Sequence, residues 1–134
     1  MRGAAYVRLG FLQLACIASL LAVGCSRRDD SSIGVKIEHA LSPEPPQVGP
    51  ATVLLKLTDP VAEPVSGARI TVETDMSHAG MAPVFAEASE TRPGQYQAQL
   101  NFAMVGDWVI LLHVRLPSGQ TLERQFNVSG VRPN

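Results

Sequence analysis

The stretch from 95 to 102 alternates strictly between polar and apolar residues, and this pattern most limits how the chain can fold. Tyr96, Ala98, Leu100 and Phe102 alternate with three glutamines and one asparagine. A period of two is typical of a β-strand that buries one face and exposes the other to water. Beyond the N-terminal region no segment shows helical periodicity, so the sequence predicts an all-β domain.

Seven segments of the chain can form such strands, and turns rich in proline and glycine separate them. Seven antiparallel strands in about 100 residues are typical of an immunoglobulin-like β-sandwich, which is the fold class that we expect. The expected strands are residues 33–39, 51–58, 68–75, 84–90, 95–102, 107–116 and 120–128.

Two aromatic residues are expected to have structural roles in this sandwich. Trp108 is the only tryptophan and has the same parity as Ile110 and Leu112, so it should pack in the core. Tyr96 stands two positions after Gly94 at the start of a strand. This arrangement resembles the tyrosine corner, in which the hydroxyl bonds to backbone a few residues upstream.

The N-terminal region has the pattern of a bacterial secretory signal. It contains arginines at positions 2 and 8, an apolar run from 9 to 23 and small residues before Cys25. The apolar run is shorter than the roughly 20 residues of a full membrane span. The stretch LAVGC, which ends at Cys25, resembles a lipobox, at which the cysteine is diacylated and becomes the first residue of the mature chain. The alternative is a soluble periplasmic protein that is cut at a nearby small residue.

This interpretation divides the chain into a lipoprotein signal peptide at 1–24, a lipidated tether at 25–32 and a β-sandwich domain at 33–134. The lipid would anchor the protein in a membrane of the cell envelope, because each buried methylene contributes about 0.8 kcal/mol. Ser26 follows the cysteine, which in such lipoproteins favours the outer membrane, with the domain in the periplasm.

The mature chain would be slightly acidic and free of disulfides. Arg2 and Arg8 leave with the signal, so nine of the 11 basic residues remain beside 12 acidic ones. There is no basic patch of the kind that binds nucleic acid. The other cysteine, Cys16, also lies in the signal. A single small domain must therefore depend on its apolar core for stability.

Soft metal-binding side chains cluster in the segment DMSHAGM, residues 75–81. Successive connections between antiparallel strands alternate between the two ends of a sandwich, so this segment should share one end with the connection at 103–106. The turn at 117–119 and the start of the domain should lie at the opposite end. The residues that this reasoning places at the first end are Met76, His78, Met81, Met104 and His39.

These residues are candidate ligands for Cu(I). Thioether sulfur is a soft, neutral ligand that favours Cu(I), and imidazole binds copper in either oxidation state. Met76 and His78 are two residues apart at a strand end and can point to one side, where the following turn could bring Met81. Asp75 could orient the imidazole of His78 through a hydrogen bond. The fourth ligand would be Met104 or His39.

A metal-free interpretation of the same residues remains open. Methionine is a common gap filler, so the methionines could form a hydrophobic cap over the open end of the sandwich. The protein would then be a structural or interaction module of an envelope or efflux complex. Its contact patch would contain Met76, Met81 and Phe85.

Four segments of the chain match a family pattern in order and spacing, over nearly all of residues 46–128. They are PPQVGPATVLLKLTD, PVSGARITVETDMSHAGMAPV, PGQYQAQLNFAMVGDWVILLHVRLPSG and RQFNV. Together they resemble the YtkA-like domain, which is related to the FixH family. The resemblance implies an exported or membrane-attached immunoglobulin-like sandwich without known catalysis. The matching residues are Pro64, Val65, Gly67, Ala68, Met76, His78, Met81, Gly94, Tyr96, Met104, Gly106 and Trp108.

The resemblance also implies a function in copper handling. FixH relatives are linked to the assembly of copper-containing respiratory oxidases, and YtkA-like domains also occur beside metal-efflux components. The expected function is to bind or hand over Cu(I), with a copper transporter, an efflux component or an oxidase-assembly factor as partner. Silver binds to thioethers equally readily, so the sequence does not choose between the two metals. No nucleophile elbow or catalytic triad pattern is present, so we do not expect an enzyme.

Overall fold

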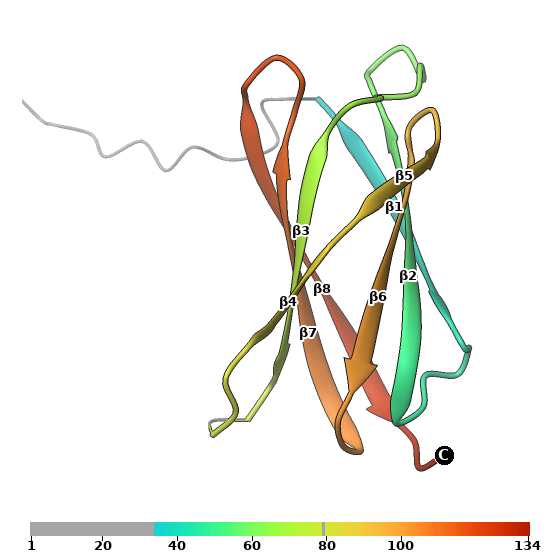
Figure 1. Cartoon of the computed structure of the whole chain (residues 1–134), viewed down its shortest axis with the longest axis vertical. Helices are drawn as coiled ribbons and strands as arrows, with labels where there is room; N and C mark the ends of the chain where they lie inside the picture. Colours follow the sequence, from blue (N-terminus) through green and yellow to red (C-terminus); the bar gives the residue numbers. More distant parts are fainter. Residues whose placement is uncertain (1–33, 79) are drawn as a thin grey trace, which may run out of the picture.

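The computed structural model describes residues 34–78 and 80–134 (Figure 1). The predicted signal peptide, the lipidation site Cys25 and the predicted tether lie outside these residues. Within the described part of the chain, no helix has the length and apolar character needed to cross a membrane.

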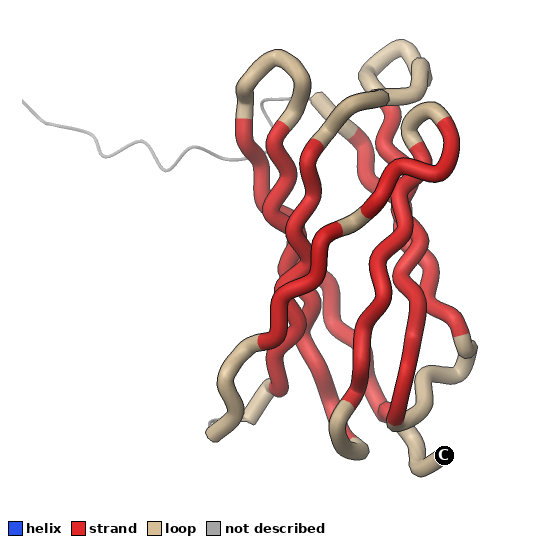
Figure 2. Tube along the Cα trace, in the orientation of Figure 1, coloured by secondary structure: helices blue, strands red, loops and turns tan. Residues whose placement is uncertain are grey.

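The described chain forms two four-stranded antiparallel sheets, which form the two layers of the domain (Figure 2). The first sheet has the order β1-β2-β6-β5, and the second has the order β4-β3-β7-β8. This arrangement confirms the predicted all-β, immunoglobulin-like sandwich. The strands are β1 (Lys36–Ser42), β2 (Gly49–Thr58), β3 (Arg69–Met76), β4 (Val84–Glu87), β5 (Ser89–Arg92), β6 (Gln95–Phe102), β7 (Gly106–Arg115) and β8 (Thr121–Val131).

The single strand expected at 84–90 is divided between the two sheets. β4 pairs with β3, whereas β5 pairs with β6 of the other sheet. Between them, the Ala88 N–H donates to the Ile70 carbonyl at 2.9 Å. The segment therefore passes from one sheet to the other along one side of the sandwich (Figure 1). This division accounts for the eighth strand, because alternation of polarity does not specify which sheet a strand joins.

The inner faces of both sheets bury the apolar positions that alternation predicted. Tyr96, Ala98, Leu100 and Phe102 of β6 are all buried, and Trp108 of β7 is only 2% exposed. The rings of Phe102 and Trp108 meet edge to face, with their centroids 5.4 Å apart. The predicted core position of Trp108 is confirmed. Burial of a side chain as large as Leu100 or Phe102 stabilises the fold by about 1.5–3 kcal/mol.

The tyrosine corner expected at Tyr96 is present. The Tyr96 hydroxyl donates to the Val65 carbonyl at 2.7 Å, and the Ala68 N–H donates to the same hydroxyl oxygen at 3.0 Å. Burial raises the pKa of Tyr96, so the phenol stays neutral at ordinary pH. A Cβ at Gly94 would lie 2.7 Å from the Pro64 Cβ, so this close approach requires glycine. The corner thus joins the connection between β2 and β3 to β6.

Replacing Tyr96 with Phe should lower the free energy of unfolding by about 2 kcal/mol, because it removes both hydrogen bonds of the corner and keeps the buried ring. Urea denaturation measures the change. Thr74→Val is the matched control, since the Thr74 hydroxyl is buried and has no hydrogen-bond partner among the described residues. Removing that hydroxyl should leave stability unchanged or raise it. Equal losses in the two variants would contradict a special role for the corner.

Candidate functional site

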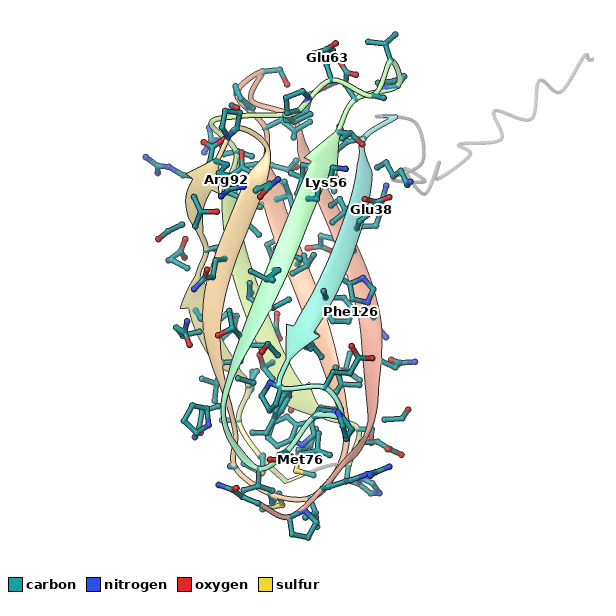
Figure 3. All side chains as sticks on the ribbon, turned by 90° about the vertical axis from the view of Figure 1, so that its right-hand side faces the viewer. Glu38, Lys56, Glu63, Met76, Arg92 and Phe126 are labelled. Atoms are coloured by element: carbon teal, nitrogen blue, oxygen red, sulfur yellow. The ribbon has the colours of Figure 1, made fainter. Side chains whose placement is uncertain are left out.

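One end of the sandwich, here called the Met end, contains the connections 43–48, 77–83 and 103–105. β3 ends there and β7 begins there, because Met76 pairs with Trp108. Met76, Met81 and Met104 are the methionines of the described chain, and all lie at this end with His78. Figure 3 shows Met76 and the other sulfur atoms of the domain at this end.

The opposite end, here called the tether end, contains the connections 59–68, 93–94 and 116–120. Gly34, the first described residue, lies there, since a Cβ on it would be 2.8 Å from the Pro60 Cγ. The described chain therefore begins at the end opposite the methionines, as the alternation of connections predicted.

Met76 and Met81 are half-buried and pack against the hydrophobic core. Met76 has the same parity as Ile70 and Val72, so its side chain continues the inner face of β3. Its terminal methyl reaches the start of β7, 3.6 Å from where a Cβ on Gly106 would lie. The Met76 thioether therefore lies beside the start of β7 and the connection 103–105.

Met104 has a fixed backbone and an outward side chain. The indole Nε1 of the buried Trp108 donates to the Met104 carbonyl at 3.1 Å, so the core residue holds this connection in place. The Met104 side chain is 45% exposed. Its thioether is therefore accessible from solvent on a backbone that the core positions.

His78 is exposed, and one nitrogen of its ring lies beside the Ser77 hydroxyl. The Ser77 hydroxyl donates to the Asp107 carbonyl at 3.0 Å, and the same hydroxyl lies 3.3 Å from His78 Nδ1. Among the described residues, the other ring nitrogen, Nε2, has no hydrogen-bond partner. Nε2 is therefore the atom of His78 that is available to a metal ion.

The carboxylate expected to orient His78 has another partner. Asp75 Oδ1 accepts a hydrogen bond from the Met76 N–H at 2.8 Å. The orienting contact of His78 comes from Ser77, whose own N–H also donates to the Asp107 carbonyl at 3.1 Å. Two hydrogen bonds to the Asp107 carbonyl of β7 hold Ser77 beside the imidazole, directly after β3. The sequence alone did not reveal these bonds.

The predicted placement of His39 at the Met end is wrong. β1 runs to Ser42 and not to 39, so His39 lies inside the strand, opposite Leu55 of β2. Its ring stacks on Phe126 of β8 with the centroids 3.8 Å apart. Figure 3 shows Phe126 about midway between the two ends. His39 therefore bridges the edges of the two sheets and is separated from the methionines.

The donor set at the Met end is unusually soft. In the described part of the chain, no group of three or more His, Cys, Asp or Glu side chains is placed to hold a metal ion. The Met end contains thioethers from 76, 81 and 104 and the imidazole of His78. Neutral sulfur and nitrogen donors of this kind fit Cu(I) or Ag(I), and they suit hard cations such as Mg²⁺ poorly.

Three exposed apolar side chains lie at or near the Met end. Val84 and Phe85 at the start of β4 are 53% and 59% exposed, and Val105 beside Met104 is 51% exposed. β4 begins directly after the connection that carries His78, so these side chains belong to the Met end or its border. Large apolar side chains exposed at one end of a domain are candidates for a contact surface with another protein.

A second cluster of titratable residues lies on the outer face of the β4-β3-β7-β8 sheet, and sequence reasoning did not find it. His113 Nε2 is 2.7 Å from Glu73 Oε2, and His113 Nδ1 is 2.9 Å from Glu123 Oε1. The bond to Glu73 is the main cause that raises the pKa of His113 above its usual value, and Glu123 adds to it while burial opposes it. The only available signal was that all three residues occupy outward positions of expected strands.

Comparisons with known proteins give one matching family and similar solved structures. The family model described as YtkA-like matches residues 32–113. The soluble domain of PmoD from Methylocystis sp. ATCC 49242 (Rockwell) is 16% identical, with 72% of this chain and 90% of that chain covered and a TM-score of 0.47. Murine CRIg is 14% identical, with 75% and 98% covered and a TM-score of 0.41. No curated protein matches the sequence. The predicted YtkA-like resemblance is confirmed, and the wider relation to FixH stays a prediction.

The contribution of His113 to stability should fall as pH rises. The folded-state pKa is raised, so the stabilisation is fully present below the unfolded-state pKa of about 6.5 and is lost as pH passes through the folded-state value. We expect the urea midpoint of the wild type, relative to His113→Gln, to decline between pH 5 and pH 8. Glu73→Gln should weaken this dependence. A pH profile identical in wild type and His113→Gln would contradict the prediction.

Proposed function

This chain belongs to the YtkA-like family, and from this premise we propose that it is a lipid-anchored periplasmic domain that binds Cu(I) at the Met end. The observation that carries the proposal is that His78 Nε2 has no hydrogen-bond partner among the described residues and stands at the end that contains the methionines. Neutral imidazole and thioether donors are the ligands that Cu(I) prefers.

The proposed ligands are His78 and the thioethers of Met76, Met81 and Met104. Met104 completes the set in place of His39, whose ring is stacked on Phe126 away from this end. Met104 is the most exposed of these methionines and stands on a backbone fixed by Trp108, so it can close over a metal ion or release it. Such an exposed site suits the transfer of an ion better than its permanent storage.

The anchor and the site would face opposite directions. Gly34 lies at the tether end, so a lipid on Cys25 would hold that end toward the membrane, in the outer membrane by the pattern at Ser26. The Met end would then face the periplasm and a partner protein. A copper transporter, an efflux component or an oxidase-assembly factor would receive or supply the ion. The protein would act by binding and transfer, without catalysis.

The exposed apolar side chains at the Met end favour a second candidate function. Val84, Phe85 and Val105 could form the centre of a protein contact that needs no metal. The protein would then be an interaction module of an envelope or efflux complex. A metal titration without binding, together with a partner crosslinked through the 77–83 connection, would favour this function over copper binding.

The chain should bind one equivalent of Cu(I), and the double variant His78→Ala with Met81→Leu should lose most of this uptake. Leucine keeps the apolar volume that Met81 packs against the core, so the loss reports on sulfur and imidazole and not on folding. Titration against a chromophoric Cu(I) chelator measures uptake, and circular dichroism checks the fold. His39→Gln, which removes an imidazole away from the Met end, should bind as the wild type does. Unchanged uptake in the double variant would refute the proposed site.

Ser77→Ala should weaken Cu(I) binding about tenfold while leaving every proposed ligand in place, because the hydroxyl that contacts His78 Nδ1 and orients the ring is lost. The same chelator competition gives the affinity. Ser118→Ala removes a hydroxyl from the turn at the tether end and should have no effect. Equal affinities of the Ser77 and Ser118 variants would show that the hydroxyl does not orient the ligand.

A further inference from the structure

Two arginines stand directly opposite each other on the outer face of the β4-β3-β7-β8 sheet, near the tether end. Arg69 is the first residue of β3, Arg115 is the last residue of β7, and the register pairs them. Both are exposed. Within residues 34–78 and 80–134 neither guanidinium has a hydrogen-bond or ion-pair partner. Opposed like charges on neighbouring strands destabilise a sheet unless a counter-charge lies between them.

The surface around this pair is hollowed on two sides, and both hollows are lined by Arg69 and Arg115. The larger has a volume of about 630 Å³ and is also lined by Thr71, His113 and residues of β8. The smaller has a volume of about 310 Å³ and is also lined by Gly67 and Leu116. The two guanidinium groups therefore stand beside open space that can admit a small ligand.

Two of the other donor side chains that border the larger hollow, Thr71 and His113, already have hydrogen-bond partners. Thr71 Oγ1 donates to Glu87, and His113 is held by its carboxylate partners. Glu123, which also lines this hollow, is the partner of His113 Nδ1 at 2.9 Å. The arginines thus add two planar forks of N–H donors that have no ion-pair partner among the described residues.

We propose that Arg69 and Arg115 form a binding site for a phosphate-class oxyanion. Guanidinium forks bind the oxygens of phosphate in bidentate fashion, and two opposed forks can hold one tetrahedral anion between them. The anion would also remove the repulsion between the paired arginines. This site lies near the end opposite the methionines and does not depend on copper binding.

Phosphate groups can reach this site from two sources. Cys25 and Gly34 are nine positions apart, so the chain between them spans at most about 30 Å when fully extended. If Cys25 is lipidated, this length keeps the tether end within reach of phospholipid headgroups. Free phosphate in the periplasm is the other source. Both sources present phosphate oxygens to the arginines. The phosphorus of a lipid headgroup carries one or two ester bonds, whereas that of free phosphate carries none.

Thermal unfolding of the full chain in a non-ionic detergent tests the proposal. Inorganic phosphate should raise the Tm relative to chloride at equal ionic strength, because a ligand that binds only the folded state stabilises it. In Arg69→Gln/Arg115→Gln this rise should disappear, and the affinity for phosphate should fall about tenfold. The matched control is Arg92→Gln/Arg132→Gln, which removes the same charge from other exposed positions and should keep the response.

The outcomes separate the proposal from general charge effects. A wild-type chain that does not respond to phosphate, or equal responses in the two double variants, would overturn the site. Acetate that matches the effect of phosphate would overturn its assignment to phosphate. Glycerophosphoglycerol, the water-soluble headgroup of phosphatidylglycerol, identifies the source: tighter binding than inorganic phosphate supports a lipid headgroup as the ligand, and weaker binding supports free phosphate.

Discussion

The antiparallel pairing of β3 with β7 is the contact on which both candidate sites depend. At one end it joins Met76 to Trp108, and at the other it joins Arg69 to Arg115. Between these ends, Ile70 and Val72 of β3 are fully buried. A slip of one residue would turn these side chains to water, so burial of the core fixes the register. The apolar packing between the two ends therefore decides which residues face each other at each end.

The Met end combines a backbone held by hydrogen bonds with adaptable side chains. Ser77 is held by two hydrogen bonds to the Asp107 carbonyl, and Met104 is held through the indole of Trp108. The thioethers on this backbone are flexible and polarizable, and they can pack against the core or turn toward a ligand. The same methionines can thus close the sandwich in the absence of an ion and take part in the proposed Cu(I) site in its presence.

The predictions from the sequence were correct where all the residues of the pattern lie within or next to one strand. The alternation in β6 predicted its buried face, and the spacing of Gly94 and Tyr96 predicted the tyrosine corner, since both are local features of one strand. The prediction failed at β1, an edge strand that buries little, where weak alternation left the boundary three residues short and misplaced His39. The sequence also did not predict the change of sheet at Ala88. A single backbone hydrogen bond to Ile70 marks this change, and no particular residue type is associated with it.

By itself, the sequence determined which side of the strongly alternating strands faces the core and which end of the sandwich each connection occupies. Those properties follow from the period-two geometry of an extended backbone and from the reversal of direction at each turn. Only the tertiary structure decided which outward residues meet, such as His113 with Glu73 and Arg69 with Arg115. Cross-strand partners depend on register, and register is set by the fit of two buried faces contributed by residues far apart in the chain.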